Sequence, residues 1–117
     1  MRTLILACTF AVLAVTVPPA PQAPKVVRVT AERFRFTPDE IRMRLGETLE
    51  LHLESDDTNH GFHIAGTEIR RVLPKRGQGE IVVTFTPDHA GRYAFECSKV
   101  CGAGHEFMHG AIVVDQE

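Results

Sequence analysis

Residues 40–45 and 49–54 alternate strictly between apolar side chains and charged or histidine side chains. Successive side chains of a β-strand point to opposite faces, so this pattern predicts two strands that are each buried on one face. Strands of this kind are typical of antiparallel sheets, and we expect both to be antiparallel. The Gly46-Glu47 pair between them predicts a turn.

Shorter alternating or valine-rich runs continue along the rest of the chain. They occupy residues 25–31, 33–36, 81–85, 91–97 and 111–114. No stretch shows a sustained repeat of 3.6 residues, which would indicate a helix. About seven or eight short strands in roughly 90 residues indicate an all-β domain, and strands with one polar face favour a two-sheet sandwich.

The N-terminal segment differs in composition from the rest. Arg2 precedes an apolar run over residues 4–17, and prolines follow it up to Pro24. We interpret residues 1–24 as an export signal, or as a short N-terminal anchor, that ends in a proline-rich linker, with one folded domain over residues 25–117. As a helix, residues 3–17 would span ~22 Å, which is short of the roughly 30 Å hydrocarbon core of a membrane.

Cys8 lies inside this apolar run, directly after Leu6 and Ala7. The arrangement faintly resembles a lipidation signal, but few residues precede the cysteine, so we interpret Cys8 as part of the signal core. An exported chain would work in the periplasm or on the outer face of the cytoplasmic membrane.

The charge balance argues against some functions. The net charge is −2, and the chain has no basic stripe of the kind that nucleic-acid binding requires, so no nucleic-acid partner is expected. No Ser-His-Asp arrangement or suitably placed pair of carboxylates indicates a hydrolase, because Asp56 and Asp57 fit a solvated turn.

The densest group of reactive side chains lies near the C-terminus. Cys97, Cys101, His105 and Met108 bring two thiols, an imidazole and a thioether together within residues 97–108. Soft sulfur ligands favour copper, whereas a thioether is not a usual zinc ligand, so copper is expected and zinc is the alternative. A blue-copper site needs one cysteine, so the second thiol indicates more than one copper ion. A disulfide is the other alternative, but so short a loop would add little stability.

A further nitrogen ligand is expected from residues 56–63, which follow a predicted strand through a polar turn. His60 should then lie at the rim of the sandwich. Alternation places His60 on the same side as Phe62 and Ile64, and His63 on the opposite side. His60 is therefore the preferred ligand, and His63 is the alternative.

The remaining histidines are expected to have other roles. His52 belongs to the polar face of its strand and His89 to a turn, so we expect both to be solvated. His109 is adjacent to Met108 and is a weaker alternative ligand.

These motifs together resemble the CuA domain of cytochrome c oxidase subunit II. The family pattern Cys-Ser-x-x-Cys-Gly-x-x-His-x-x-Met is matched by Cys97, Ser98, Cys101, Gly102, His105 and Met108. The upstream pattern Asp-x-x-His-[Ser/Gly]-[Phe/Trp] is matched by residues 57–62. The similarity extends over about residues 25–117 and looks nearest to the short subunit II of ba-type oxidases, which also carry His-Gly-Phe-His.

The resemblance implies a cupredoxin-like Greek-key β-sandwich with a dinuclear copper (CuA) centre. Thiolates of Cys97 and Cys101 would bridge two copper ions, one of which would take His60 and the other His105. Weak axial ligands would come from Met108 and the backbone carbonyl of Lys99. Sharing one electron between two ions spreads the structural change of oxidation over more bonds, so electron transfer needs little reorganisation.

The same resemblance implies an electron-entry module. It would accept electrons from a c-type cytochrome or a small cupredoxin and pass them to an oxidase subunit I, without itself reducing oxygen. The alternatives are a free-standing periplasmic CuA carrier, a module of another reductase such as nitrous oxide reductase, and a copper-delivery protein.

Three features differ from the family pattern. Lys99 stands where the family commonly has a Glu that helps to bind magnesium, so no magnesium site is expected. The chain has no Trp, whereas many members receive electrons through one. It also has a single apolar run where many members have a transmembrane hairpin.

Overall fold

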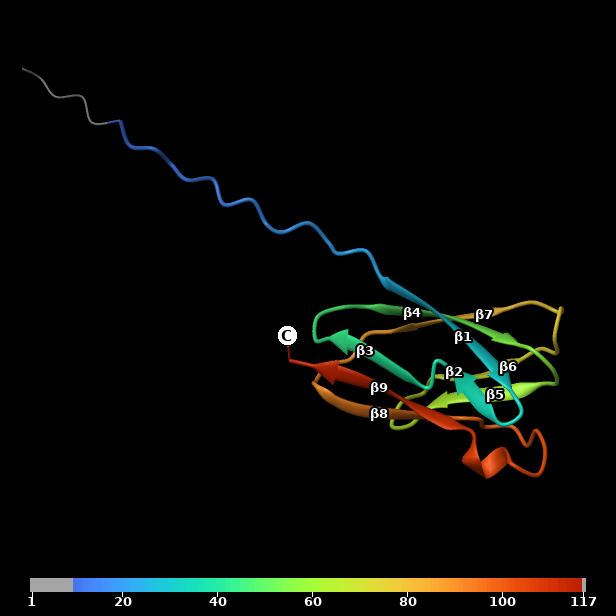
Figure 1. The fold of residues 1–117 in the computed structure, drawn as a ribbon. Coiled ribbons are helices and arrows are strands. Elements are labelled where there is room, and N and C mark those ends of the chain that lie inside the picture. The colour runs from blue at the N-terminus through green and yellow to red at the C-terminus, as the bar shows by residue number, and fades with distance from the viewer. Residues whose placement is uncertain (1–9, 117) are drawn as a thin grey trace, which may run out of the picture.

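The computed structural model describes residues 10–116, and from Lys25 onward the chain forms two layers of strands (Figure 1). The elements of this part of the chain are β1 (Lys25–Glu32), β2 (Arg35–Thr37), β3 (Glu40–Arg44), β4 (Leu49–Ser55), β5 (His60–Ile64), β6 (Arg70–Leu73), β7 (Ile81–Phe85), β8 (Gly91–Glu96), the short 3-10 helix η1 (His105–Phe107) and β9 (His109–Asp115). The predicted all-β sandwich is therefore confirmed.

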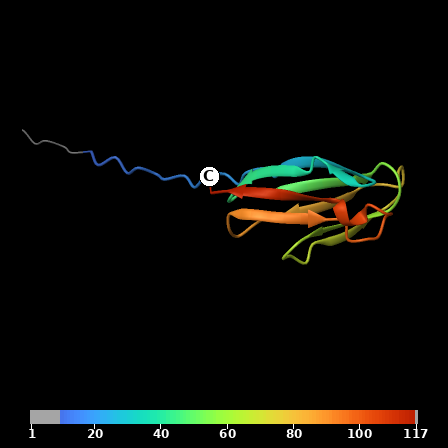
Figure 2. The same ribbon diagram turned by 60° about the horizontal axis from the view of Figure 1, so that its bottom comes forward.

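The two sheets face each other across a common core (Figure 2). One has the strand order β2-β1-β4-β7, and the other has the order β3-β9-β8-β5-β6. Neighbours in sequence often belong to different sheets, as β3 and β4 do, so the chain crosses repeatedly between the layers. This crossing brings strand ends that are distant in sequence to the same end of the sandwich.

The predicted strand directions are corrected in part. Strand β3 does not run antiparallel to its neighbour as expected, because it pairs in parallel with β9, from Glu40 opposite Ala111 to Arg44 opposite Asp115. β4 is antiparallel to β7, as expected, and parallel to β1. Alternation reports that one face of a strand is buried, and it carries no information about the direction of the partner strand.

The sequence pattern did not predict β6, because this strand lies at an edge and only Leu73 is buried in it. Its single neighbour is β5, with Leu73 opposite His60 and Val72 opposite Gly61. The helix η1 was also not predicted, since it spans only one turn within the cysteine-rich loop.

Three phenylalanine rings form the part of the core nearest to the cysteine-rich loop. The ring centroids of Phe36, Phe62 and Phe95 lie 5.2–5.8 Å apart, and the rings are almost fully buried. Fully burying such a side chain contributes about 1.5–3 kcal/mol. Phe62 is two residues from His60, and Phe95 is two residues before Cys97, so this packing anchors the strand that carries His60 and the strand that leads into the cysteine-rich loop.

Residues 10–24 form no helix or strand. Among the described residues, no helix is both long enough and apolar enough to cross a membrane. The interpretation of residues 1–24 as a signal or anchor stays a prediction, and Arg2 and Cys8 lie outside the described residues.

Candidate metal centre

His60 begins β5 and its side chain is completely buried. Its Nε2 lies 2.6 Å from Oδ1 of Asp57. A carboxylate only accepts hydrogen bonds, so Nε2 donates to it, and Nδ1 is the ring nitrogen left to face a metal. Nδ1 lies 3.9 Å from Sγ of Cys97. A carboxylate behind a histidine is the usual arrangement for orienting a metal-binding imidazole.

Asp57 is held as an anion in this position. Burial by itself raises its pKa, but hydrogen bonds from the backbone N–H of Arg33, from His60 and from the backbone N–H of Thr58 together lower the pKa below the usual range. The carboxylate fixes the orientation of the imidazole that it contacts. The sequence motif contains Asp57, but its hydrogen bond to His60 becomes visible only in the fold.

The two thiols of the loop lie side by side. Sγ of Cys97 is 3.8 Å from Sγ of Cys101, and both cysteines are free and buried. A disulfide would require a separation of about 2.05 Å, so the structure holds a dithiol. Cys97 also contacts the backbone carbonyl of Lys99, at 3.1 Å from its Sγ.

Burial, followed by the neighbouring Cys97, raises the pKa of the Cys101 thiol to about 11. The metal-free site therefore holds this thiol in its protonated form at neutral pH. Metal binding has to displace that proton, so the affinity of the site for metal rises with pH.

His105 and Met108 complete the group from the far side of the loop. Nδ1 of His105 lies 3.7 Å from Sγ of Cys101, and Sδ of Met108 lies 3.8 Å from the same sulfur. The single turn of η1 spaces these two residues. The backbone N–H of Cys97 donates to the carbonyl of Met108 at 3.0 Å, which closes the loop at its base.

The loop lies directly over β5 at Gly61. A Cβ atom at this position would approach Oγ of Ser98 to 2.3 Å and the backbone N of Lys99 to 2.6 Å. Real Cβ atoms do not approach so closely, so this position requires glycine. The backbone N–H of Gly61 also donates to Sγ of Cys97 at 3.5 Å.

The segment between β1 and β2 packs against the loop from the other sheet. The ring of Phe34 leaves no space for a Cβ at Gly102 or Gly104, where the nearest approaches would be 2.8 and 2.4 Å. Nε of Arg33 donates to the carbonyl of Cys101 at 2.7 Å. No sequence pattern predicted these contacts, because Arg33 and Cys101 are far apart in the chain.

His63 lies away from the sulfur atoms. Its Nδ1 is 3.2 Å from Oε1 of Glu96, and its Nε2 is 3.3 Å from the carbonyl of Thr67. Phe62 and Ile64 are buried with His60, while His63 is partly exposed on the opposite face of β5. The structure thus places these side chains as the alternation predicted.

The expectation for His52 was wrong. Its side chain is only 16% exposed, because Glu50 and Glu80 bind its two ring nitrogens at 2.7 and 3.1 Å. His89 is 72% exposed, as expected, and contacts Asp88. His109 is exposed at the start of β9.

The donor set of this centre suits copper. His60 and the two cysteines have ligand atoms that all lie within 4.8 Å of one another. His105 and Met108 add an imidazole and a thioether beside Cys101. Thiolates, imidazoles and a thioether in one buried group match the preferences of copper, and the thioether fits zinc poorly.

The sequence matches the cupredoxin-like domain family over residues 4–114. This match covers most of the chain and agrees with the two-sheet fold, so the chain belongs to the cupredoxin-like domain family. This chain is 38% identical over 92 residues to cytochrome c oxidase subunit 2 of Thermus thermophilus, and the alignment covers 77% of this chain. The chain spans 65% of the length of that relative.

Solved structures show the same relationship. A chain of a heme-copper terminal oxidase dimer matches with a TM-score of 0.64 and 28% identity, over 78% of this chain and 65% of that one. The periplasmic domain of cytochrome oxidase subunit II of Bradyrhizobium japonicum matches with a TM-score of 0.72 over 83% of this chain and 88% of that one. Its identity of 17% supports the fold alone. The resemblance to oxidase subunit II that the motifs indicated is confirmed.

Proposed function

We propose that this domain is a dinuclear copper electron-transfer module of the CuA type. The proposed ligands are His60, Cys97, the backbone carbonyl of Lys99, Cys101, His105 and Met108. When bound, the pair of copper ions would supply one-electron oxidation and reduction. The chain contributes two thiolates and two imidazoles, orients His60 through Asp57, and keeps water away from the sulfur atoms by burying them.

One observation carries this proposal above the others. Two free thiols lie 3.8 Å apart, and each has a different histidine within 4 Å, His60 beside Cys97 and His105 beside Cys101. A blue-copper site, which holds one copper ion, would use one thiolate. Two thiolates flanked by two imidazoles offer an equivalent set of donors to each of two ions.

The redox partners are inferred from the relatives. Similarity to cytochrome c oxidase subunit 2 and to a chain of a heme-copper oxidase dimer supports a terminal oxidase as electron acceptor. A c-type cytochrome or a small cupredoxin is the proposed donor. The domain would work in the periplasm or on the outer face of the cytoplasmic membrane, as the periplasmic location named for the Bradyrhizobium japonicum domain supports.

Burial of the ligands argues against copper delivery. Cys97, Cys101 and Met108 are 5%, 6% and 1% exposed, and His60 is fully buried. Transfer of copper to another protein needs ligands that the acceptor can reach. A group of side-chain donors in which only His105 is partly exposed instead suits an ion that stays in place while electrons move.

The test is to load the full chain with copper, measure the copper content per chain, and record its electron paramagnetic resonance spectrum. We expect two copper ions per chain and hyperfine structure from one electron shared equally between both. His60→Ala and His105→Ala should each abolish the shared-electron signal, whereas His89→Ala should leave it intact. One copper per chain, or loss of the signal on His63→Ala with retention on His60→Ala, would contradict the proposal.

A further inference from the structure

Three side chains that can bind metal lie in one row across the five-stranded sheet. His63 of β5 is opposite Glu96 of β8, and Glu96 is opposite His109 of β9. Residues that lie opposite each other on neighbouring strands have their side chains on the same face of the sheet. The neighbouring residues Phe62 and Phe95 are buried in the core. The three side chains, which we name the His-Glu-His row, are therefore on the outer face of the sheet.

The spacing of the His-Glu-His row suits a single ion. Neighbouring strands are about 4.8 Å apart, so the backbones at His63 and His109 are separated by roughly 10 Å, with Glu96 between them. Two imidazoles that lean towards the middle strand from either side can meet the carboxylate of Glu96 at one point. The row therefore offers two nitrogen donors and one oxygen donor to the same ion.

The contacts of the His63 ring leave one of its nitrogens available as a ligand. Nε2 is 3.3 Å from the carbonyl oxygen of Thr67, and because a carbonyl only accepts, Nε2 donates to it. Nη2 of Arg70 is 3.3 Å from Nδ1, and because a guanidinium only donates, Nδ1 accepts from it. The proton is therefore on Nε2 and the lone pair on Nδ1. Metal-binding histidines commonly donate their second ring nitrogen to a backbone carbonyl in this way.

The lone pair of His63 faces the carboxylate of Glu96. Nδ1 is 3.2 Å from Oε1 of Glu96, and two atoms that both accept hydrogen bonds need a positive charge beside them at this distance. Arg70 provides that charge from the edge strand β6, and this residue is exposed. Two ligand atoms ~2.1 Å from one tetrahedral ion are about 3.4 Å apart. The two atoms are thus already near the separation that a shared ion requires.

His109 lies on the other side of Glu96, next to a hollow. It is exposed at the start of β9, so its ring can turn towards Glu96. The hollow has a volume of about 300 Å³ and is lined by Glu96, His109 and Glu106 of η1, together with three of the proposed copper ligands. It provides space for an ion and a water ligand, and Glu106 adds a second negative charge.

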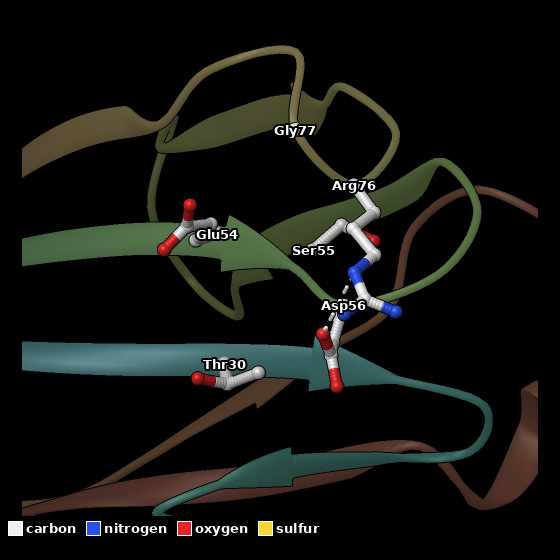
Figure 3. A pocket seen from close by; sticks show the side chains of 6 residues that line it. All are labelled: Thr30, Glu54, Ser55, Asp56, Arg76 and Gly77. Atoms are coloured by element: carbon white, nitrogen blue, oxygen red, sulfur yellow. Dashed lines mark ion pairs between the residues drawn. The ribbon is translucent and has the colours of Figure 1, made fainter.

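Two other polar groups do not offer such a set of donors. Both ring nitrogens of His52 face carboxylates, those of Glu50 and Glu80, so both donate and neither is left for a metal. The hollow between the turns at residues 56 and 76 is lined by no histidine or cysteine (Figure 3). Arg76 pairs there with Asp56, with Nε 3.5 Å from Oδ1.

We propose that the His-Glu-His row is a second metal site, for a divalent ion with the ligand preferences of zinc. Two imidazoles and one carboxylate are a donor set that zinc uses in proteins with water as its fourth ligand. No thiol takes part, so the site differs from the copper centre in its chemistry as well as in its ligands. The proposal does not depend on the electron-transfer function.

The first test measures zinc binding to the copper-loaded full chain, in which copper occupies the thiols. Calorimetric titration with zinc chloride should show one zinc ion per chain. His63→Gln and His109→Gln should each weaken binding about tenfold or more, because each removes one of three ligands. His52→Gln and His89→Gln are the matched controls and should keep the affinity of the parent chain. No zinc binding, or equal affinity in the parent and both row variants, would overturn the proposal.

The second test identifies the bound atoms in a chain that cannot hold copper through thiolates. Cys8, Cys97 and Cys101 are replaced by serine, and the histidines of the metal-free full chain are labelled with ¹⁵N. Zinc chloride should shift the ring nitrogen signals of His63 and His109, with Nδ1 as the bound atom of His63. Shifts of His60 and His105 in their place would overturn the proposal. This result stands even if copper does not load and the proposed function fails.

The third test uses the cation that now faces Nδ1. Arg70→Gln should strengthen zinc binding about threefold or more, because it removes a positive charge that competes with the ion. Arg71→Gln is the matched control, since Arg71 lies opposite Phe62 and therefore on the other face of β6. Zinc affinity in Arg70→Gln that is equal to or weaker than in Arg71→Gln would overturn the proposal, because Arg70 would then not compete for the ligand atom.

Discussion

Met108 contacts the metal centre through a thioether that is 1% exposed and lies 3.8 Å from Sγ of Cys101. A thioether is a weaker donor than the thiolates and imidazoles around it. It should therefore adjust the reduction potential more than it determines whether copper binds. This distinction can be tested at a single residue.

We predict that Met108→Leu retains both copper ions and raises the reduction potential, because the oxidised state loses an electron donor. Met43→Leu is a matched control, since Met43 is 2% exposed in the core and distant from the loop in sequence. Exchange of Leu for Met usually costs less than about 1.5 kcal/mol of stability. Copper content and the potential from a redox titration decide the outcome. Loss of copper from Met108→Leu alone would show that Met108 is a principal ligand.

Gly61 is a second position at which one residue affects the whole site. We predict that Gly61→Ala displaces the loop, weakens copper binding, and destabilises the protein by about 1–3 kcal/mol, because the added methyl group has no space. Urea unfolding of the metal-free chain and copper titration measure the two effects.

Gly46→Ala provides the control for this substitution. Gly46 has φ +96°, and a Cβ added there would meet no atom within 4 Å, so alanine adds backbone strain without any clash. It should lower stability by about 1 kcal/mol and leave copper binding unchanged. Equal copper affinity in Gly61→Ala and Gly46→Ala would contradict the role assigned to the Gly61 contact.

At the scale of elements, β4 and the start of β7 are linked on the outer face of the four-stranded sheet by His52. The hydrogen bonds that His52 donates to Glu80 and, to a smaller extent, to Glu50 raise the pKa of His52 above its ordinary value of 6.5. The hydrogen bond that Glu80 accepts from His52 in turn lowers the pKa of Glu80. The protonated imidazole is therefore stabilised by folding.

We predict that this cluster makes the stability of the protein depend on pH. A histidine whose folded pKa is raised stabilises the fold fully below its unfolded pKa of about 6.5, and this contribution is lost as pH rises through the folded value. Urea unfolding of the metal-free, reduced chain at pH values from about 6 to 9 should show this loss. His52→Gln should remove that part of the pH dependence.

His89→Gln is the matched control, since His89 is exposed and contacts a single carboxylate, Asp88. It should change the pH profile much less than His52→Gln does. If both variants retain the full profile of the parent chain, the His52 cluster does not contribute to it.

The element scale also shows where a sequence pattern carries too little information. β6 is an edge strand with one buried residue, and its hydrogen bonds come from its neighbour β5. Without an apolar alternation, nothing in residues 70–73 distinguishes a strand from a loop. The direction of β3 was missed for a related reason, since its parallel partner β9 lies at the other end of the chain.

At the scale of the whole molecule, the proposed ligands join separate parts of the fold. His60 begins β5, and the remaining ligands lie in the loop between β8 and β9. Arg33 and Phe34 extend the contact to the segment that joins β1 and β2. Metal binding should therefore stabilise both sheets together.

We predict that copper raises the thermal unfolding temperature of the full chain. An ion that binds only the folded state contributes about 2.7 kcal/mol when its free concentration is about 100 times its dissociation constant. Thermal unfolding with and without copper(I) under reducing conditions measures the shift. Cys101→Ser is the control and should show a much smaller increase, and an equal increase in that variant would exclude bridging by Cys101.

The sequence alone was sufficient for the fold class, and it predicted the group of side chains that the fold brings together. Strict alternation in residues 40–45 and 49–54 reports burial directly, because a strand has a period of two. The motif in residues 97–108 predicts copper binding without knowledge of the fold, because the ligand types and the short loop are local properties of the chain. The alternation around His60 is also a local pattern, and it predicted that His60 and His63 lie on opposite faces of the strand.

Only the tertiary structure decided the features that depend on distant segments. These are the parallel pairing of β3 with β9, the contact of Glu80 with His52, and the packing of Phe34 on the loop. Each brings together residues that are far apart in sequence. A periodic pattern records which face of an element is buried, while the identity of the neighbour is determined by how the whole chain packs.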